Sequence, residues 1–414
     1  MTVEVAETLP NQFVCFLDGD EHPWTGYVVV DSIINGKCTG GVRMMPTVSL
    51  LELKHMARAM TLKYGFLGIP RGGMKAGIKA DPEGDPATKQ AILAEFGRKL
   101  SPMVRRQILQ LGMDMGVGPE DFDGLMRAAG LGEARSSDPV SHSRSGFFTS
   151  LTVFSGVKVA TEAIGLDLGR CTAAIQGFGS VGSTLAQRLA GRGVKLIAVS
   201  TIKGAMHNAD GFDIDDLLEN ARRHGSGMVE HLVGERIGMD ELLELEVDVL
   251  SPCAGSWSVS LNNAHRIRAK VVCPGANCAV TPDAERILFD RGIVSVPHFA
   301  ASCGGALGST MEFLGCTEAQ IESFVEREVE RKQRNLVARA RREGALPLDL
   351  AEEDALVKFG RMQRTQQANW RSRLMGIGMR AYKSGVLPAP VTRSLLPRYL
   401  GGRLWSDSTL TTGG

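Results

Sequence analysis

The feature that most limits the possible folds is a regular alternation of strands and helices between residues 171 and 296. Apolar runs that predict strands are separated by helical stretches. The predicted strands are residues 171–176, 194–199, 247–251, 270–273 and 292–296. Such βαβ units build a parallel sheet with helices on both faces. This part of the chain is therefore expected to be a doubly wound α/β domain.

The first of these units carries a glycine pattern in the stretch "AAIQGFGSVG". Gly177, Gly179 and Gly182 stand at GxGxxG spacing, after a predicted strand and before a predicted helix. In that context the first glycine allows a tight turn, the second lets a pyrophosphate approach the backbone, and the third lets helix and strand pack closely. Unpaired N–H groups at the helix start would bind the phosphates. We expect a dinucleotide site here that also includes Phe178, Ser180 and Val181.

The end of the second strand of this unit lacks the carboxylate that would bind the ribose hydroxyls of NAD. It reads "VSTIKG", with Ser200, Thr201 and Lys203. No acid there would repel a 2′-phosphate, and a hydroxyl and an ammonium could bind one. The sequence predicts NAD or NADP as cofactor and favours NADP, although a surface lysine explains Lys203 equally well.

Two lysines twelve residues apart mark a second candidate site, in "MTLKYGFLGIPRGGMKAG" (residues 60–77). Lys63 lies in an apolar run, Lys75 lies among glycines, and Asp114 follows in "LGMDMGVG". A nearby second cation and desolvation would lower the pKa of Lys75 from about 10.4 toward neutrality. Such a lysine can move protons on and off a reacting amine or water, and Asp114 could share that proton. Each of the three taken alone is also compatible with an ordinary surface charge.

The segments around the lysines predict a mixed α/β region. Residues 12–34 predict two strands around a polar turn. Residues 49–66 predict a helix, in which Ser49 and Glu52 form a capping-box pattern. The stretch 68–86 predicts a loop with a short extended piece. Charged helical segments follow residue 317, and a last helix is predicted over about 350–384.

Length and charge narrow the classes of protein to which the chain can belong. A chain of 414 residues suits two domains. Its 47 basic and 46 acidic residues nearly balance, so neither nucleic acid nor an anionic membrane is expected as a partner. The sequence has no run of 18 apolar residues and no secretory signal, which predicts a cytoplasmic protein. The eight cysteines form no CxxC pair, and no metal site is expected.

Several motifs occur in an order that resembles the glutamate/leucine/phenylalanine/valine dehydrogenase family. They are "TGGVRMMPTVSLLELKHMARAMTLKYGFLGIPRGGMKAG", "DMG", "AAIQGFGSVG", "VVCPGANCAVTPDA" and "SCGGALGSTME". The resemblance runs from about residue 12 to 315. It implies a substrate-binding and oligomerisation domain over 1–140, a Rossmann domain over 141–317, and C-terminal helices over 318–414 that return to the first domain. It also implies a homo-oligomer.

The activity that this resemblance implies is reversible, NAD(P)-dependent oxidative deamination of an L-amino acid to a 2-oxo acid and ammonia. In such enzymes the lysine that matches Lys63 binds the α-carboxylate, the one that matches Lys75 is catalytic, and the aspartate that matches Asp114 is its proton-transfer partner. The other implied positions are Gly40 and Gly41 at the substrate, and Thr149, Ala254 and Asn277 at the cofactor.

The chain departs from the family pattern at a position that would bind the side chain of the substrate. Glutamate-specific relatives place a lysine immediately before the Gly-Gly pair, where this chain has Thr39, and a pocket serine is retained as Ser309. Two hydroxyls predict a small or a polar, uncharged substrate side chain, so glutamate is not expected. Two other functions stay open from the sequence: reduction of a preformed imine on the same fold, and a non-catalytic protein that keeps the nucleotide site.

Overall fold

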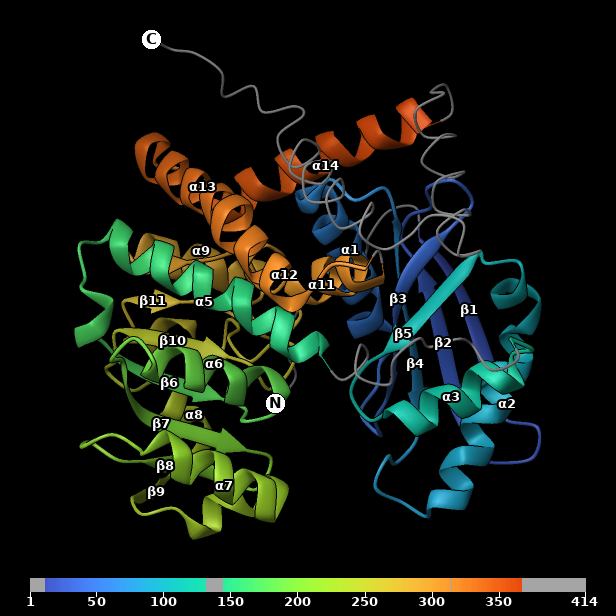
Figure 1. Ribbon diagram of the computed structural model, residues 1–414, viewed down its shortest axis with the longest axis horizontal. Coiled ribbons are helices and arrows are strands. Elements are labelled where there is room, and N and C mark those ends of the chain that lie inside the picture. The colour runs from blue at the N-terminus through green and yellow to red at the C-terminus, as the bar shows by residue number, and fades with distance from the viewer. Residues whose placement is uncertain (1–11, 132–143, 314, 367–414) are drawn as a thin grey trace. The chain divides into compact units, whose positions relative to one another are not determined.

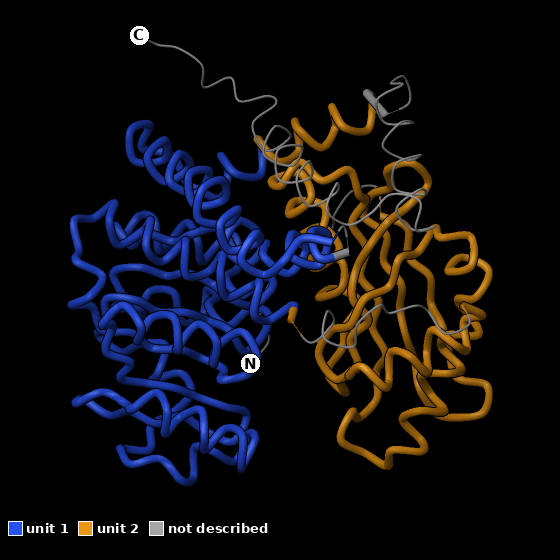
Figure 2. The backbone as a smooth tube through the Cα atoms, in the orientation of Figure 1, with its two compact units in different colours: residues 1–5, 145–353 blue, residues 6–144, 354–414 orange. Residues whose placement is uncertain are grey.

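The computed structural model describes residues 12–131, 144–313 and 315–366 (Figure 1). These residues fall in two compact units (Figure 2). We call Ser145–Glu353 the central unit, and the described residues before 145 and after 353 the N-terminal unit. The boundary differs from the one inferred from sequence, because residues 318–353 belong to the central unit. The predicted α/β class is confirmed.

The N-terminal unit is built on a five-stranded sheet with the order β1-β2-β4-β3-β5. Its strands are β1 (Phe13–Asp18), β2 (Thr25–Val30), β3 (Cys38–Met44), β4 (Gly72–Lys79) and β5 (Leu109–Met113). Strand β2 pairs antiparallel with β1 and β4, whereas β3 runs parallel to both β4 and β5. The two strands predicted within residues 12–34 are confirmed.

Two strands at the middle of this sheet are the main differences from the sequence prediction. The predicted loop over 68–86 contains the eight-residue strand β4, and β3 was not predicted. Both strands are rich in glycine, which lowers strand propensity and hides them from a search for β-branched residues. Glycine is needed there because helix α1 (Leu50–Leu67) lies close: a Cβ on Gly73 would lie 2.3 Å from the backbone nitrogen of Thr61.

Helices cover both faces of the five-stranded sheet (Figure 1). Helix α1 packs on one face, while α2 (Pro86–Arg105) and α3 (Pro119–Ala128) build an apolar core on the other. The Ser49 cap of α1 is confirmed, since its hydroxyl accepts a hydrogen bond from the N–H of Glu52. The Glu52 side chain, however, pairs with Arg43 at 2.6 Å.

The central unit contains the predicted parallel sheet, with the strand order β12-β11-β10-β6-β7-β8-β9. Its parallel strands are β6 (Thr172–Gln176), β7 (Lys195–Thr201), β10 (Val249–Pro252), β11 (Val271–Val272) and β12 (Val294–Ser295). Two short strands that the sequence did not predict, β8 (Gly204–His207) and β9 (Glu235–Ile237), add an antiparallel edge.

Helices pack on both faces of this sheet and bury a separate apolar core on each (Figure 1). One face carries α5 (Ser145–Ala163), α6 (Ser180–Ala190) and α7 (Ile214–His224). The other face carries α8 (Met239–Leu243) and α9 (Pro282–Asp290). The short α10 (His298–Ala301) leads into α11 (Gly304–Phe313), which packs against α5.

The C-terminal helices divide between the two units. Helices α12 (Glu318–Phe324) and α13 (Glu330–Glu343) belong to the central unit, where the buried Gln333 side chain accepts a hydrogen bond from Ser155 of α5. Helix α14 (Pro347–Gln366) ends in the N-terminal unit, where Phe359 and Met362 pack on Ile34. The remainder of the helix predicted to reach residue 384 lies outside the described residues.

Candidate active site

The predicted catalytic residues meet in the N-terminal unit. The ammonium of Lys75 in β4 forms an ion pair with the carboxylate of Asp114, just after β5. Both groups are removed from water, since Lys75 is 3% exposed and the Asp114 side chain 11%. Lys63, near the end of α1, is 5% exposed in the same unit. Their low exposure shows that none of the three is an ordinary surface charge. Lysine and aspartate are rarely buried unless they are paired.

The register of the sheet explains how these residues come together. Side chains alternate between the two faces of a strand. In β4, the side chains of Met74, Ala76 and Ile78 enter the apolar core. Gly73, Lys75 and Gly77 alternate with them and face α1. The register pairs Gly41 with Gly112 on the neighbouring strands. A Cβ on Gly41 would lie 3.0 Å from the Cβ of Asp114, so glycine leaves room for this carboxylate on the α1 face.

Arg43 belongs to the same cluster of charges, although no role was predicted for it from the sequence. Its guanidinium lies 2.6 Å from the carboxylate of Glu52 and 3.4 Å from that of Asp114, and it is 6% exposed. Asp114 also accepts a hydrogen bond from the N–H of Met115. These contacts orient the carboxylate toward Lys75. The period-two spacing of residues 39, 41 and 43 in β3 was the signal that could have identified Arg43.

The predicted substrate-binding residues lie in different units. Thr39, Gly40 and Gly41 follow one another in β3 of the N-terminal unit, and the Thr39 hydroxyl donates a hydrogen bond to the side-chain oxygen of Gln110 at 3.1 Å. Ser309 is exposed on α11 of the central unit. The structure therefore gives Thr39 a partner in its own sheet.

In the central unit, the three glycines of the motif lie in the turn after β6 and the first turns of α6. Gly177 adopts φ 92°, a left-handed conformation that favours glycine, and a Cβ there would strike Ala254. A Cβ on Gly182 would lie 2.0 Å from the carbonyl oxygen of Gly177, whereas one on Gly179 would meet no atom within 4 Å. Gly179 precedes α6, so this open space lies at unpaired N–H groups. The cradle fits a pyrophosphate.

The residues at the end of β7 are more enclosed than their sequence suggests. The Ser200 hydroxyl is fully buried and accepts a hydrogen bond from the N–H of Gly177, which ties the glycine turn to β7. The Thr201 hydroxyl donates to the carbonyl of Ser226 and accepts from the N–H of Lys203. Lys203 itself is exposed. A ligand at this edge would therefore meet the lysine before the two hydroxyls.

The other predicted cofactor residues come from helix α5 and from the loops after β10 and β11. Thr149 is buried in α5, where its hydroxyl donates to the carbonyl of Ser145. Ala254 and Asn277 are half-buried in the loops after β10 and β11. Burial raises the pKa of the adjacent Cys253 to about 12, so this thiol is protonated at neutral pH. Cysteine is therefore unsuited to act as a nucleophile there.

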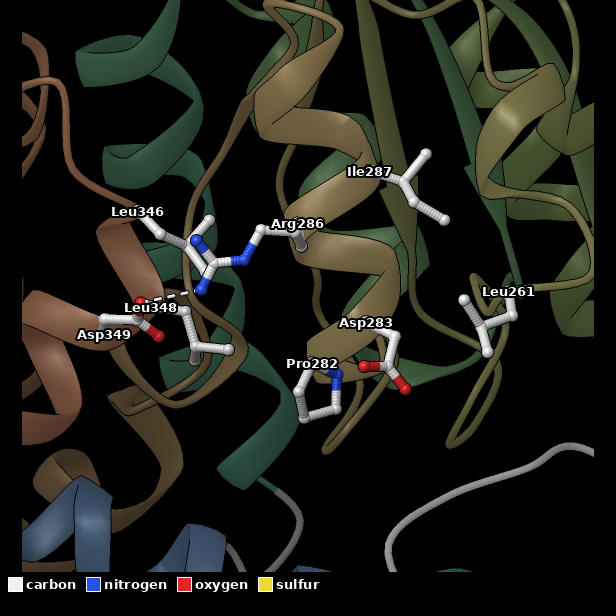
Figure 3. Close-up of a pocket in the computed structure, with 8 residues that line it drawn as sticks. All are labelled: Leu261, Pro282, Asp283, Arg286, Ile287, Leu346, Leu348 and Asp349. Carbon is white, nitrogen blue, oxygen red and sulfur yellow. Dashed lines mark hydrogen bonds and ion pairs between the residues drawn. The ribbon is translucent and has the colours of Figure 1, made fainter.

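A surface pocket of about 370 Å³ lies elsewhere in the central unit, between α9 and the start of α14 (Figure 3). It is lined mainly by apolar side chains, and its Arg286 and Asp349 form an ion pair of 3.0 Å. It contains none of the predicted site residues. Within the described part of the chain, no group of acidic, histidine and cysteine side chains could hold a metal ion, and no helix combines the length and hydrophobicity needed to cross a bilayer.

A doubly wound unit with a dinucleotide cradle, joined to a unit with a buried lysine–aspartate pair, defines a nicotinamide-dependent dehydrogenase. Comparisons with known proteins specify the class further. The model of the glutamate/leucine/phenylalanine/valine dehydrogenase family matches residues 141–368, and that of its dimerisation domain matches residues 13–129.

Individual relatives agree with this match. A glutamate dehydrogenase of Thermotoga maritima is 34% identical over 72% of this chain and 74% of its own. A catabolic NAD-specific glutamate dehydrogenase of Bacillus subtilis is 32% identical over 77% of each chain. A hetero-hexameric glutamate dehydrogenase of Thermus thermophilus has a TM-score of 0.74 at 25% identity, over 86% of this chain and 90% of its own. The chain belongs to the glutamate/leucine/phenylalanine/valine dehydrogenase family and is an NAD(P)-dependent amino acid dehydrogenase.

Proposed function

We propose that the protein catalyses the reversible oxidative deamination of an L-amino acid to a 2-oxo acid and ammonia. The observation that carries the proposal is the buried Lys75–Asp114 pair beside glycines on the α1 face of the N-terminal sheet. An ammonium and a carboxylate in contact can pass a proton between them and a reacting amine or water. Lys63 would bind the α-carboxylate as a charge-assisted hydrogen-bond donor. The bound nicotinamide supplies the hydride chemistry.

Substrate choice is the finer part of the proposal. Position 39 holds threonine in place of the cation expected for glutamate, and for that reason glutamate was not expected from the sequence. The comparisons do not support this expectation, because the relatives named above are glutamate dehydrogenases. We propose a substrate with a polar side chain and include glutamate among the candidates.

For the cofactor we propose NADP in preference to NAD. The support is the absence of a carboxylate from "VSTIKG", together with two cations at the same edge. Lys203 is exposed, and the guanidinium of Arg236 in β9 donates a hydrogen bond to the carbonyl of Lys203 at 2.8 Å. These two cations would attract a 2′-phosphate. Against this, the Bacillus subtilis relative is NAD-specific. Comparing kcat/KM for both cofactors in the wild type and in Lys203→Ala tests the preference.

We also propose a homo-oligomer that assembles through the N-terminal unit. The support is the match of residues 13–129 to a dimerisation domain, and the hexameric state named for the Thermus relative. Light scattering coupled to size-exclusion chromatography tests this proposal, and a monomeric mass would contradict it.

One screen tests the activity. Purified protein is incubated with ammonia, a panel of 2-oxo acids and either reduced cofactor, and absorbance at 340 nm is followed. We expect consumption that depends on both ammonia and the 2-oxo acid. Consumption with methylamine but not with ammonia would favour imine reduction. Cofactor binding without turnover of any substrate would favour the non-catalytic alternative.

A further inference from the structure

The C-terminal helix α13 carries a polar residue on its buried stripe. The helical run from α12 into α13 includes a π-helical turn, Val325–Val329, and buried residues recur at every fourth position: Val325, Val329, Gln333 and Val337. Gln333 is fully buried, whereas its neighbours on this stripe are apolar. Burying a carboxamide costs free energy unless its polar atoms form hydrogen bonds. The partners of Gln333 therefore indicate why a polar residue lies in the stripe.

The carboxamide of Gln333 joins α13 to two other helices of the central unit. Its NH₂ donates to the carbonyl of Thr152 in α5 at 3.0 Å and to that of Ala300 in α10 at 2.9 Å. Its oxygen accepts from the hydroxyl of Ser155 in α5 at 2.7 Å. Because the two carbonyls can only accept, the NH₂ must face them, and this fixes the orientation of the amide. Gln333 therefore sets the separation of α5 from the end of α10.

Thr152 extends this contact to the start of α11. Its buried hydroxyl donates to the carbonyl of Thr149 at 3.1 Å and accepts from the N–H of Gly304 at 2.9 Å. The N–H groups in the first turn of a helix lack partners within that helix, so a side chain of α5 satisfies one of those of α11. Gln333 and Thr152 thus hold α5, α10 and α11 in one buried network.

Helices α5 and α11 also approach each other closely at glycines. A Cβ on Gly305 would lie 2.9 Å from the hydroxyl oxygen of Thr149, and one on Gly308 would strike the ring of Phe148. Close-packed interiors transmit a displacement instead of absorbing it. A shift of α11 would therefore move Thr149, the residue of α5 that is expected at the cofactor. The same helix α11 carries Ser309, which is expected at the substrate.

We propose that Gln333 is a positioning residue, which holds α5 and α11 where the nicotinamide half of the cofactor binds. This inference rests on the proposed function and gives a role in it to a C-terminal helix. The adenosine ribose binds at the end of β7, so the nicotinamide lies on the other side of β6, toward β10 and β11. Hydride transfer requires a precise approach of two carbon atoms, and a misplacement of about 1 Å can cost about 10²-fold in rate. Gln333 should therefore affect turnover more than cofactor binding, because the pyrophosphate cradle lies at α6.

The first test is Gln333→Leu, which keeps a similar volume but cannot form the three hydrogen bonds. The reduced cofactor is titrated by fluorescence, and turnover is then measured per binding site with the most active 2-oxo acid of the panel. We expect turnover per site to fall about 10- to 100-fold, and KM for the cofactor to change less than about 3-fold. A residue needed only for folding would lower the number of binding sites and leave turnover per site unchanged.

The second test, Gln333→Glu, makes the loss depend on pH. An ionised carboxylate would face the carbonyls of Thr152 and Ala300 without a proton to donate, whereas a protonated one can donate to one of them. Turnover per site, relative to the wild type, should therefore rise at least about 3-fold from pH 8 to pH 6, since burial favours the protonated form. The same ratio for Gln333→Leu should not change with pH. Gln187→Glu, at an exposed glutamine of α6, is the matched control and should follow the wild type.

A variant in α5 keeps the test decisive if the Gln333 variants fold poorly. Thr152→Val keeps the shape of the side chain and removes the hydroxyl that bonds Gly304. It should also lower turnover per site with little change in KM for the cofactor. Turnover per site equal to that of the wild type in the folded variants would overturn the role of Gln333 and leave the proposed function standing. A folded wild type that converts no 2-oxo acid with either cofactor would overturn both.

Discussion

The candidate sites of the two units are built from different parts of the polypeptide. In the N-terminal unit, charged side chains stand on the face of a sheet, and glycines on neighbouring strands leave space around them. In the central unit, the backbone of a glycine turn at the end of β6 forms the cradle. Side chains on strands give geometry suited to proton transfer, while backbone N–H groups give a phosphate site without a charged residue. A substitution should therefore act differently in the two units.

The largest effect is expected for Lys75→Ala, which removes the ammonium that we propose transfers protons. Turnover should fall by about 10²- to 10⁴-fold. Cofactor affinity should stay within a few-fold, because the cradle belongs to the central unit. Stopped-flow turnover and fluorescence titration of the reduced cofactor measure the two quantities. Lys79→Ala, at an exposed lysine of the same strand, is the control. Equal losses in both variants would refute a catalytic role for Lys75.

The same difference between the two units explains how much of each site could be predicted from the sequence. The cradle is local: Gly177, Gly179 and Gly182 act within one turn, so their spacing alone predicts their roles. The lysine site depends on the register of strands that are distant in the chain, and glycine hides two of those strands. Lys75 and Asp114 were expected from the residues and from the resemblance. Arg43 was not, because its place in the site follows from the alternation along β3, a strand that was not predicted.

The two units also differ in how a carboxyl group with low exposure is accommodated. Asp114 in the N-terminal unit pairs with cations, whereas burial raises the pKa of Glu285, in α9 of the central unit, to about 7. Because its pKa is raised in the folded state, Glu285 contributes to folded-state stability fully below its unfolded pKa of 4.5. This contribution is lost as the pH rises toward 7. Glu285→Gln should remove a pH dependence on the order of 3 kcal/mol.

Chemical denaturation of the wild type and Glu285→Gln at pH 5, 6, 7 and 8 measures this effect. The difference between the two proteins should grow with pH up to about 7 and then level off, with the variant more stable at pH 8. Asp283→Asn, at an exposed position of the same helix, should show no such trend. A constant difference at every pH would show that Glu285 is ionised in the folded protein.

The glycines of the cradle offer a smaller and more selective effect. Gly179→Ala places a methyl group where no protein atom lies within 4 Å, so the midpoint of unfolding should not change. The methyl would occupy space meant for phosphate, and KM for the cofactor should rise about 10-fold, the equivalent of about 1.4 kcal/mol. Gly182→Ala should lower stability as well, because its Cβ would strike the carbonyl oxygen of Gly177. Unchanged cofactor binding in Gly179→Ala would place the pyrophosphate elsewhere.

The smallest effect is expected at the surface pocket of the central unit. Arg286 and Asp349 on its wall are each more than half exposed. Exposed ion pairs contribute at most about 1 kcal/mol, because water and salt screen them. Arg286→Ala should therefore lower the free energy of unfolding by less than that amount and leave kcat and both KM values unchanged. Steady-state kinetics and urea denaturation measure these quantities. A several-fold loss of turnover in Arg286→Ala would link this pocket to catalysis, and the division of ligand binding between strand side chains and the glycine cradle would then be incomplete.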